Sequence, residues 1–200
     1  MARKKRETRG GIIYHVLNRC VPEFALFRND LDYLAFARLM GEAANRYRVR
    51  VLAWCLMPNH WHAVLWPRED GDLSRFCKWL GQVHTQQVHA LRGTKGRGHI
   101  YQGRFESIPV QPDGHFLRVC RYVERNALRA RLVQRAEDWR WGSLWWWVSG
   151  REMEAWPVER SPEWVERVNR PMNQAEEAAL RNCLAAKRPF GSDRWLRQMR

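Results

Sequence analysis

The chain has 200 residues, of which 45% are hydrophobic and 28% charged, a composition that supports a buried core and excludes the disordered and collagen-like classes. No stretch approaches the ~20 consecutive apolar residues of a membrane-spanning helix, and no secretory signal is recognisable, so we expect a cytoplasmic protein without a membrane partner. The formal net charge of +14, from 35 Lys and Arg against 21 Asp and Glu, points to a polyanionic partner, most simply nucleic acid.

The predicted elements follow the order strand, helix, strand, strand, helix, strand, helix. Alternation or β-rich composition predicts strands over residues 12–18, 49–57, 60–66 and 104–111. Apolar residues at helical spacing predict helices over residues 31–47, 73–91 and 115–130. The turn dipeptide Pro58-Asn59 joins the second and third strands into an antiparallel hairpin. Long helices interleaved with such a hairpin indicate an α+β sandwich, with helices on one or both faces of a small sheet.

Regular patterning fades after Trp139, where Trp, Arg and Pro become dense. Four prolines divide this stretch into short pieces: Pro157, Pro162, Pro171 and Pro189. A helix is still predicted over residues 174–187, followed by a tail over residues 188–200. We therefore expect a main domain over residues 1–150 and an irregular or helical C-terminal extension over residues 151–200, with a DNA-contacting or regulatory role.

Two histidines stand two positions apart in His60-Trp61-His62, on a predicted strand. Side chains alternate between the faces of a strand, so His60 and His62 point the same way, with Cα atoms roughly 7 Å apart, and their imidazoles can converge on one metal ion. Two ligands are too few for a closed structural zinc site, and the open positions suit a Lewis-acid catalyst. The pattern also occurs by chance, and the alternative is two hydrogen-bonded surface histidines.

On the predicted helix over residues 115–130, Tyr122 and Asn126 are i, i+4 neighbours that share a face beside the apolar stripe. Three arginines flank them: Arg118, Arg125 and Arg129. A tyrosine hydroxyl beside arginines is a candidate nucleophile toward a phosphate. The alternative is a tyrosine at the boundary between helix and sheet, with its hydroxyl in water.

Further basic and histidine side chains are candidates for DNA contact. They are the N-terminal Arg3, Lys4, Lys5, Arg6 and Arg9, the first-strand His15, and Arg92, Lys95, Arg97 and Arg104 on a glycine-rich loop. The alternatives are a disordered tail for the N-terminal group and a solvated mobile loop for the last group. His84 and His89 are five residues apart, so they do not share a helix face, and we predict both on the helix surface.

Five motifs occur in a fixed order along the chain. They are Y-H-V (residues 14–16), L-M-P-N-H-W-H (56–62), Y-Q-G-R-F (101–105), R-Y-V-E-R-N-A-L-R-A (121–130) and R-P-F-G-S-D (188–193). In this order they resemble the REP-associated tyrosine transposases, relatives of the single-tyrosine HUH transposases of small insertion sequences. The resemblance covers most of residues 9–150 and returns in the tail.

The resemblance implies a ferredoxin-like fold with a central antiparallel sheet, a catalytic domain over residues 1–150, and single-stranded or hairpin DNA as partner. His60 and His62 match the HUH pair, Tyr122 matches the nucleophile, and Asn126 matches a residue that completes the metal site. Such nitrogen and oxygen ligands suit Mg²⁺ or Mn²⁺. The chain departs from the family at Ala127, because many relatives carry proline after the matching asparagine.

We therefore expect a metal-dependent single-stranded DNA endonuclease and strand transferase that forms a 5′-phosphotyrosine intermediate, acts at REP-type hairpins, and works as a monomer or homodimer. The alternative is a non-catalytic, hairpin-binding regulator with the same basic surface. Two further enzyme classes also use such histidines. A relaxase or replication initiator usually carries a third histidine and larger domains, which this chain lacks. A hydrolytic metal nuclease would cleave DNA without a covalent step and so would not need Tyr122.

Overall fold

The computed structural model describes residues 8–22, 24–96 and 98–199, and its centre is a four-stranded sheet in the order β2-β3-β1-β4. The strands are β1 (Ile13–Arg19), β2 (Val49–Met57), β3 (His60–Pro67) and β4 (Glu106–Val110). All three pairings are antiparallel. One long helix follows β1 and a second follows β3. This order of elements and the antiparallel sheet confirm the predicted ferredoxin-like α+β fold.

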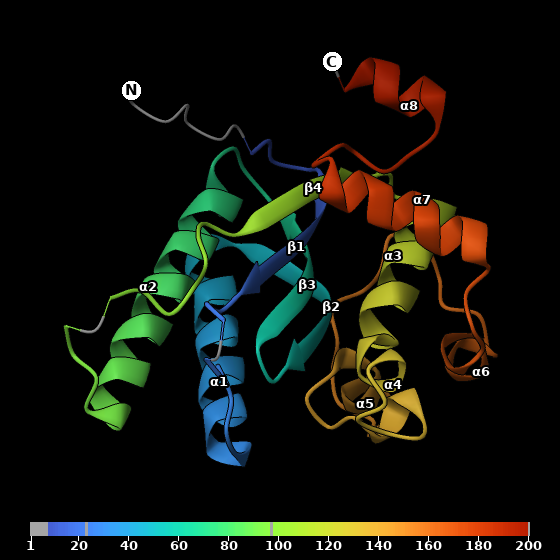
Figure 1. The fold of residues 1–200 in the computed structure, drawn as a ribbon. Helices are drawn as coiled ribbons and strands as arrows, with labels where there is room; N and C mark the ends of the chain where they lie inside the picture. Colours follow the sequence, from blue (N-terminus) through green and yellow to red (C-terminus); the bar gives the residue numbers. More distant parts are fainter. Residues whose placement is uncertain (1–7, 23, 97, 200) are drawn as a thin grey trace.

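Helices cover both faces of the sheet (Figure 1). One face carries α1 (Asp30–Tyr47) and α2 (Asp72–Arg92). The other side carries α3 (Gly114–Glu124), α4 (Asn126–Arg129), the short 3-10 helix η1 (Ala136–Asp138), α5 (Ser143–Val148), α6 (Trp164–Asn169) and α7 (Gln174–Ala185). The last helix, α8 (Asp193–Gln198), lies beyond the end of the sheet near the C-terminus.

Local sequence sets the ends of these elements. The Asn29 side chain caps α1 by accepting a hydrogen bond from the amide of Asp32, and Arg48 ends the helix in the left-handed conformation. The predicted helix over residues 115–130 is interrupted once, at Arg125, so that it is α3 followed by the single turn of α4. Tyr122 and Asn126 stay one turn apart across this break.

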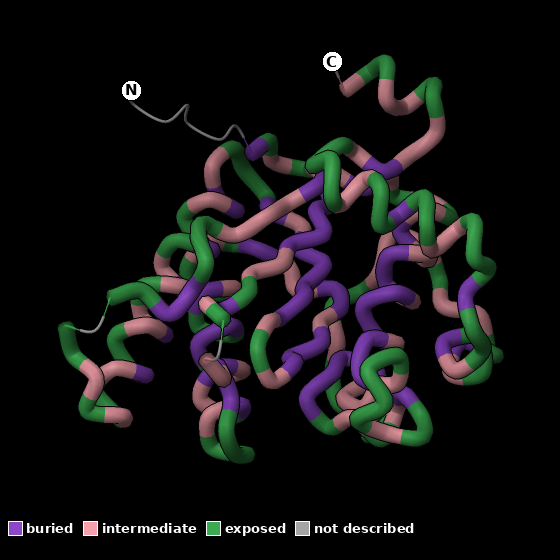
Figure 2. Tube along the Cα trace, viewed as in Figure 1, coloured by how far each residue is buried: buried purple, intermediate pink, exposed green. Residues whose placement is uncertain are grey.

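The sheet separates two hydrophobic cores, because successive side chains of each strand point to opposite faces. Trp61 packs with Phe36 in the core beneath α1 and α2. The second core lies beneath α3 and contains Val64 and Trp164. Figure 2 shows buried positions running along the strands and α3, with exposed positions on the outer side of α7.

The C-terminal extension contributes to the second core and to one edge of the sheet. Trp164 and Leu180 are fully buried there. Phe190 forms a bridge with Val110 on the outer edge of β4, while Gly142, which precedes the extension, forms one with Cys55 on the outer edge of β2. Such partial cover shortens the free strand edges, which otherwise promote aggregation. A boundary near residue 150 stays a prediction, since the extension and α3 share one core.

None of the helices in the described part of the chain is long and apolar enough to span a bilayer.

Substitution of the buried indole in the extension tests its share of the core. Trp164→Ala removes a large, fully buried side chain, so we expect a loss of about 3–5 kcal/mol in the free energy of unfolding. Urea denaturation measures this loss. Leu91→Ala, at a side chain that is 76% exposed, is the control and should change stability by less than about 0.5 kcal/mol. Equal midpoints for both variants would contradict the packing described.

Candidate active site

The pairing of β3 with β1 positions the two histidines of the predicted metal pair. His60 lies opposite Arg19 and His62 lies opposite Leu17, in consecutive same-face positions of the antiparallel register. The ring centroids of His60 and His62 are 5.0 Å apart, with the rings nearly perpendicular. Trp61 between them points into the other core. The predicted alternation is confirmed, and both imidazoles line one cleft beneath α3 and α4.

Each imidazole is held through one ring nitrogen. Nδ1 of His62 lies 3.0 Å from Nε2 of His15, and Nδ1 of His60 lies 2.7 Å from Oδ1 of Asn59. These bonds leave Nε2 of both His60 and His62 for another partner. Burial lowers the pKa of His60 to about 4 and the pKa of His62 well below its usual 6.5. Both rings are therefore neutral at pH 7, which is the form that binds metal ions.

Tyr122 extends from α3 toward these histidines. Its ring centroid is 6.0 Å from that of His62 and 6.2 Å from that of His15, with edge-on geometry in both cases. Asn126 begins α4 one turn later, and its Oδ1 accepts a hydrogen bond of 3.2 Å from Arg129. The Nδ2 atom of Asn126 is buried and has no hydrogen-bond partner among the described residues. An unpaired N–H donor at this place is costly unless an acceptor, such as a phosphate or water oxygen, takes its hydrogen bond.

These side chains line one cleft of about 480 Å³ between the sheet, α4 and α7. Its lining residues are Leu17, Arg19, Met57, His60, His62, Tyr122, Asn126, Arg129, Ala130, Arg181 and Leu184. The Arg129 guanidinium lies 4.8 Å from the centre of the Tyr122 ring and pairs with Glu177 of α7 at 3.3 Å. The cleft lining thus carries the positive charge of Arg19, Arg129 and Arg181, and Glu177 neutralises only part of it. This excess of positive charge suits a phosphate.

The donor set fits a hard divalent cation held at an open site. In the described part of the chain, no group of three His, Cys, Asp or Glu side chains could hold a metal ion. A site in this cleft would therefore rest on Nε2 of His60 and His62 and on the amide oxygen of Asn126. This set has two nitrogens and one oxygen, and it leaves the remaining coordination positions open to water and substrate oxygens. Such a set suits Mg²⁺ or Mn²⁺ better than a structural Zn²⁺, which takes four protein ligands.

Two residues predicted to contact DNA have internal roles instead. His15 is 1% exposed and bonds His62, so it presents no surface to a ligand. Arg92 donates to the carbonyls of Ala25 and Leu26 and pairs with Asp32. Neither side chain is therefore placed to contact DNA in this structure, since His15 is buried, with its Nδ1 unpartnered among the described residues, and the Arg92 guanidinium is engaged inside the protein.

The other predicted DNA contacts fall in several places. Arg125 donates to the carbonyls of Val168 and Asn169, and Arg118 pairs with Glu176. Lys95 is exposed, Arg9 and Arg104 line a second and larger cavity, and only Arg129 lines the cleft. Arg3, Lys4, Lys5, Arg6 and Arg97 lie outside the described residues. DNA contact by the accessible members of this set stays a prediction.

The sequence analysis missed two arginines of the cleft, Arg19 and Arg181. Arg19 reaches it because β1 pairs with β3 in a register that places Arg19 opposite His60. Arg181 reaches it because α7 folds back over α3. Both depend on long-range packing, and no local pattern marks them.

Comparisons with known proteins bear on the family and on the fold. The family model described as "Transposase IS200 like" matches residues 8–126, a range that contains the two histidines, Tyr122 and Asn126. A solved structure, "Structure of the REP associates tyrosine transposase bound to a REP hairpin", is similar with a TM-score of 0.61 and 18% sequence identity, over 80% of this chain and 96% of that one. No curated protein matches the sequence.

The likeness to the solved structure confirms the fold, with its antiparallel sheet and flanking helices. The family match spans more than half of the 200 residues. The chain therefore belongs to the IS200-like transposase family, whose proteins act on DNA.

Proposed function

We propose that this protein is a metal-dependent single-stranded DNA endonuclease and strand transferase, with Tyr122 as its nucleophile. One observation carries the proposal: a single cleft of about 480 Å³ is lined by four side chains from three different elements. They are Tyr122 from α3, His60 and His62 from β3, and Asn126 from α4. A nucleophile, candidate cation ligands and arginines within one cleft are the components that phosphoryl transfer needs.

His60, His62 and Asn126 would hold the cation. When bound, a divalent ion polarises a non-bridging phosphate oxygen and stabilises charge on the leaving oxygen. The protein's part is to present neutral imidazole nitrogens and an amide oxygen with little freedom to move. His62 is fixed by His15 from below, and His60 is fixed by Asn59 from the adjoining turn. Such outer partners orient a ligand and increase its basicity.

The covalent step exchanges one phosphate ester for another. The Tyr122 oxygen attacks phosphorus and forms an O–P bond, the bond from phosphorus to the 3′ oxygen breaks, the phenolic proton leaves to water, and the 3′ oxygen takes a proton from water. The product is a 5′-phosphotyrosine and a free 3′ hydroxyl. Because the bond energy is conserved, attack by a 3′ hydroxyl reverses the step and joins strands without ATP.

The arginines supply positive charge around the phosphate. Arg129 lies above the Tyr122 ring and bonds Asn126, so it stands beside both the nucleophile and a candidate ligand. Arg19 lies on the same strand as His15, lines the cleft, and has no ion-pair partner among the described residues. Guanidinium groups bind phosphate oxygens through paired donors. We assign Arg129 and Arg19 to binding the scissile phosphate.

Hairpin DNA is the proposed substrate. The similar solved structure is described as bound to a REP hairpin, and the net charge of +14 on this chain suits a folded polyanion. A non-catalytic regulator that binds hairpins remains the second candidate, because the same basic surface would serve it. The two differ in whether the protein becomes covalently attached to DNA.

Removal of the phenolic oxygen separates the two candidates. With end-labelled hairpin oligonucleotides and Mn²⁺, Tyr122→Phe should lower the yield of a denaturation-resistant protein–DNA adduct by about 10³-fold or more, since no other nucleophile replaces it. Hairpin affinity should stay within about twofold. Tyr47→Phe, on α1 and away from the cleft, is the matched control and should form the adduct normally. EDTA should abolish the adduct for every variant. An undiminished adduct with Tyr122→Phe would exclude this mechanism.

The bond between His15 and His62 predicts a specific effect on metal affinity. When Nε2 of His62 binds a cation, its Nδ1 carries the proton and donates it to His15. His15→Leu removes that acceptor and should weaken Mn²⁺ binding by about 10–100-fold, measured by titration calorimetry and by the Mn²⁺ dependence of adduct formation. His15→Gln offers an amide oxygen in the same place and should restore much of the affinity. Equal Mn²⁺ affinity for the His15→Leu and unsubstituted proteins would refute this role.

A further inference from the structure

One buried polar atom beside the cleft has no role in the proposed mechanism. Asn126 is 2% exposed, lines the cleft, and begins α4 just after the break at Arg125. The mechanism uses its amide oxygen as a cation ligand and gives no task to its amide nitrogen. This nitrogen, Nδ2, is buried and has no hydrogen-bond partner among the described residues.

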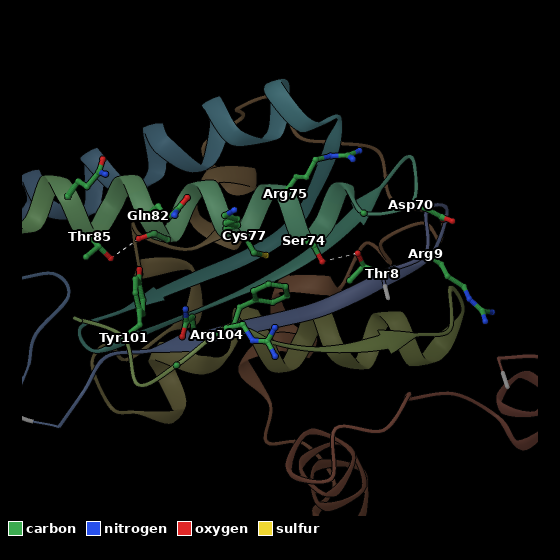
Figure 3. A pocket seen from close by; sticks show the side chains of 17 residues that line it. Thr8, Arg9, Asp70, Ser74, Arg75, Cys77, Gln82, Thr85, Tyr101 and Arg104 are labelled. Carbon is green, nitrogen blue, oxygen red and sulfur yellow. Dashed lines mark hydrogen bonds between the residues drawn. The ribbon is translucent and has the colours of Figure 1, made fainter. Parts of the chain in front are cut away.

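The unpaired nitrogen coincides with the site of chemistry. Within the described ranges, buried side-chain nitrogens without a partner belong to His15, Trp61, Arg121, Asn126 and Arg160. Of these five residues only Asn126 lines the cleft. None of the five lines the larger cavity of about 1070 Å³ along α2, where Thr8 and Ser74 are hydrogen-bonded to each other (Figure 3). The missing hydrogen bond of Asn126 therefore marks a place that a ligand in the cleft completes.

Arg129 fixes the orientation of the amide. Nη2 of Arg129 donates to Oδ1 of Asn126 at 3.2 Å. A guanidinium has donors and no acceptor, so only the oxygen end of the amide can face it. A flip of the amide would lose this bond and place N–H against N–H. The NH₂ group is therefore held at the other end, with its hydrogens free for an acceptor.

Arg129 is itself held above the tyrosine ring. Its guanidinium lies 4.8 Å from the centre of the Tyr122 ring, and its Nη1 pairs with Glu177 of α7 at 3.3 Å. Both side chains of this ion pair are partly exposed, and such pairs contribute little to stability. A phosphodiester carries the same single negative charge and also offers two oxygens, so it can take the place of the Glu177 carboxylate on Arg129.

A phosphate on Arg129 lies beside the unpaired nitrogen. Oδ1 and Nδ2 of Asn126 are bonded to one carbon, and Oδ1 already contacts the guanidinium. An amide oxygen has two lone pairs, so one accepts from Arg129 while the other is left for the cation. One planar amide can therefore serve the cation with its oxygen and a phosphate oxygen with its nitrogen.

We infer that Asn126 is a catalytic residue whose Nδ2 donates a hydrogen bond to a non-bridging oxygen of the scissile phosphate. The inference rests on the proposed function, which places that phosphate on Arg129 beside Tyr122. The amide transfers no proton. The bond from phosphorus to the Tyr122 oxygen forms, the bond to the 3′ oxygen breaks, and both protons are exchanged with water. The donor stabilises negative charge on the phosphate oxygens, and loss of one such preorganised donor slows a reaction by about 10²–10³-fold.

Asn126→Asp separates the two functions of the amide. The carboxylate has the same shape and keeps oxygen for the cation, but it has no N–H donor at pH 7. We expect the Mn²⁺ affinity, measured by titration calorimetry without DNA, to be equal or higher. The single-turnover rate of adduct formation should fall by about 10²-fold. Asn126→Ala removes both groups and should weaken Mn²⁺ binding as well.

Asn45→Asp is the matched control for the added charge. Asn45 is exposed on α1 and lies outside the cleft. This variant should change neither the Mn²⁺ affinity nor the rate of adduct formation.

Sulfur substitution in the DNA distinguishes a lost hydrogen bond from repulsion by the new carboxylate. Each non-bridging oxygen of the scissile phosphate is replaced in turn by sulfur, a weak hydrogen-bond acceptor, which gives two diastereomeric hairpins. With the unsubstituted protein, one diastereomer should react about tenfold more slowly than the phosphate, and thiophilic Cd²⁺ should not restore the rate. With Asn126→Asp this sulfur effect should disappear, because the hydrogen bond that it reports is already absent. Repulsion would slow both diastereomers alike and leave the sulfur effect in place.

Two outcomes would overturn the inference alone. One is a rate of adduct formation for Asn126→Asp close to that of the unsubstituted protein. The other is an equal sulfur effect in the two proteins, which would assign Nδ2 to a water molecule. Both outcomes require an adduct, so they leave the Tyr122 mechanism intact. Failure of the unsubstituted protein to form an adduct with any phosphate hairpin would overturn the proposed function and the inference together.

Discussion

The antiparallel pairing of β1 with β3 is the constraint on which the whole site depends. One register places Leu17 opposite His62 and Arg19 opposite His60. The same register places His15 beside His62, with Nε2 of His15 3.0 Å from Nδ1 of His62. A slip of one residue would turn every one of these side chains to the other face of the sheet. The burial of Trp61 in the opposite core makes such a slip costly, because the indole would be exchanged for an imidazole in an apolar environment. The position of the candidate ligands is therefore fixed by hydrophobic packing on the face that they do not occupy.

The orientation of Tyr122, the proposed nucleophile, is fixed from the other direction, by the C-terminal part of the chain. Glu124, two residues after Tyr122, is 2% exposed and accepts hydrogen bonds of 2.7 Å from Ser143 and from the Trp164 indole. Arg160 approaches the same carboxylate at 3.7 Å. Burial raises the pKa of Glu124, and the arginine and the two donors oppose that shift. These contacts oppose rotation of α3 about its axis, so residues 143–164 support the geometry of a cleft that they do not line.

Much of the fold followed from local pattern, and the site followed only in part. The β-rich run over residues 49–57 coincides with β2, and helical spacing found Tyr122 and Asn126 on one face. Residues whose role depends on distant partners were misjudged: His84, predicted at the surface, is buried against Tyr101, and His15 supports His62. Helices α5, α6 and α8, at six residues each, are too short to show a period and owe their stability to tertiary packing. No local signal marks such contacts.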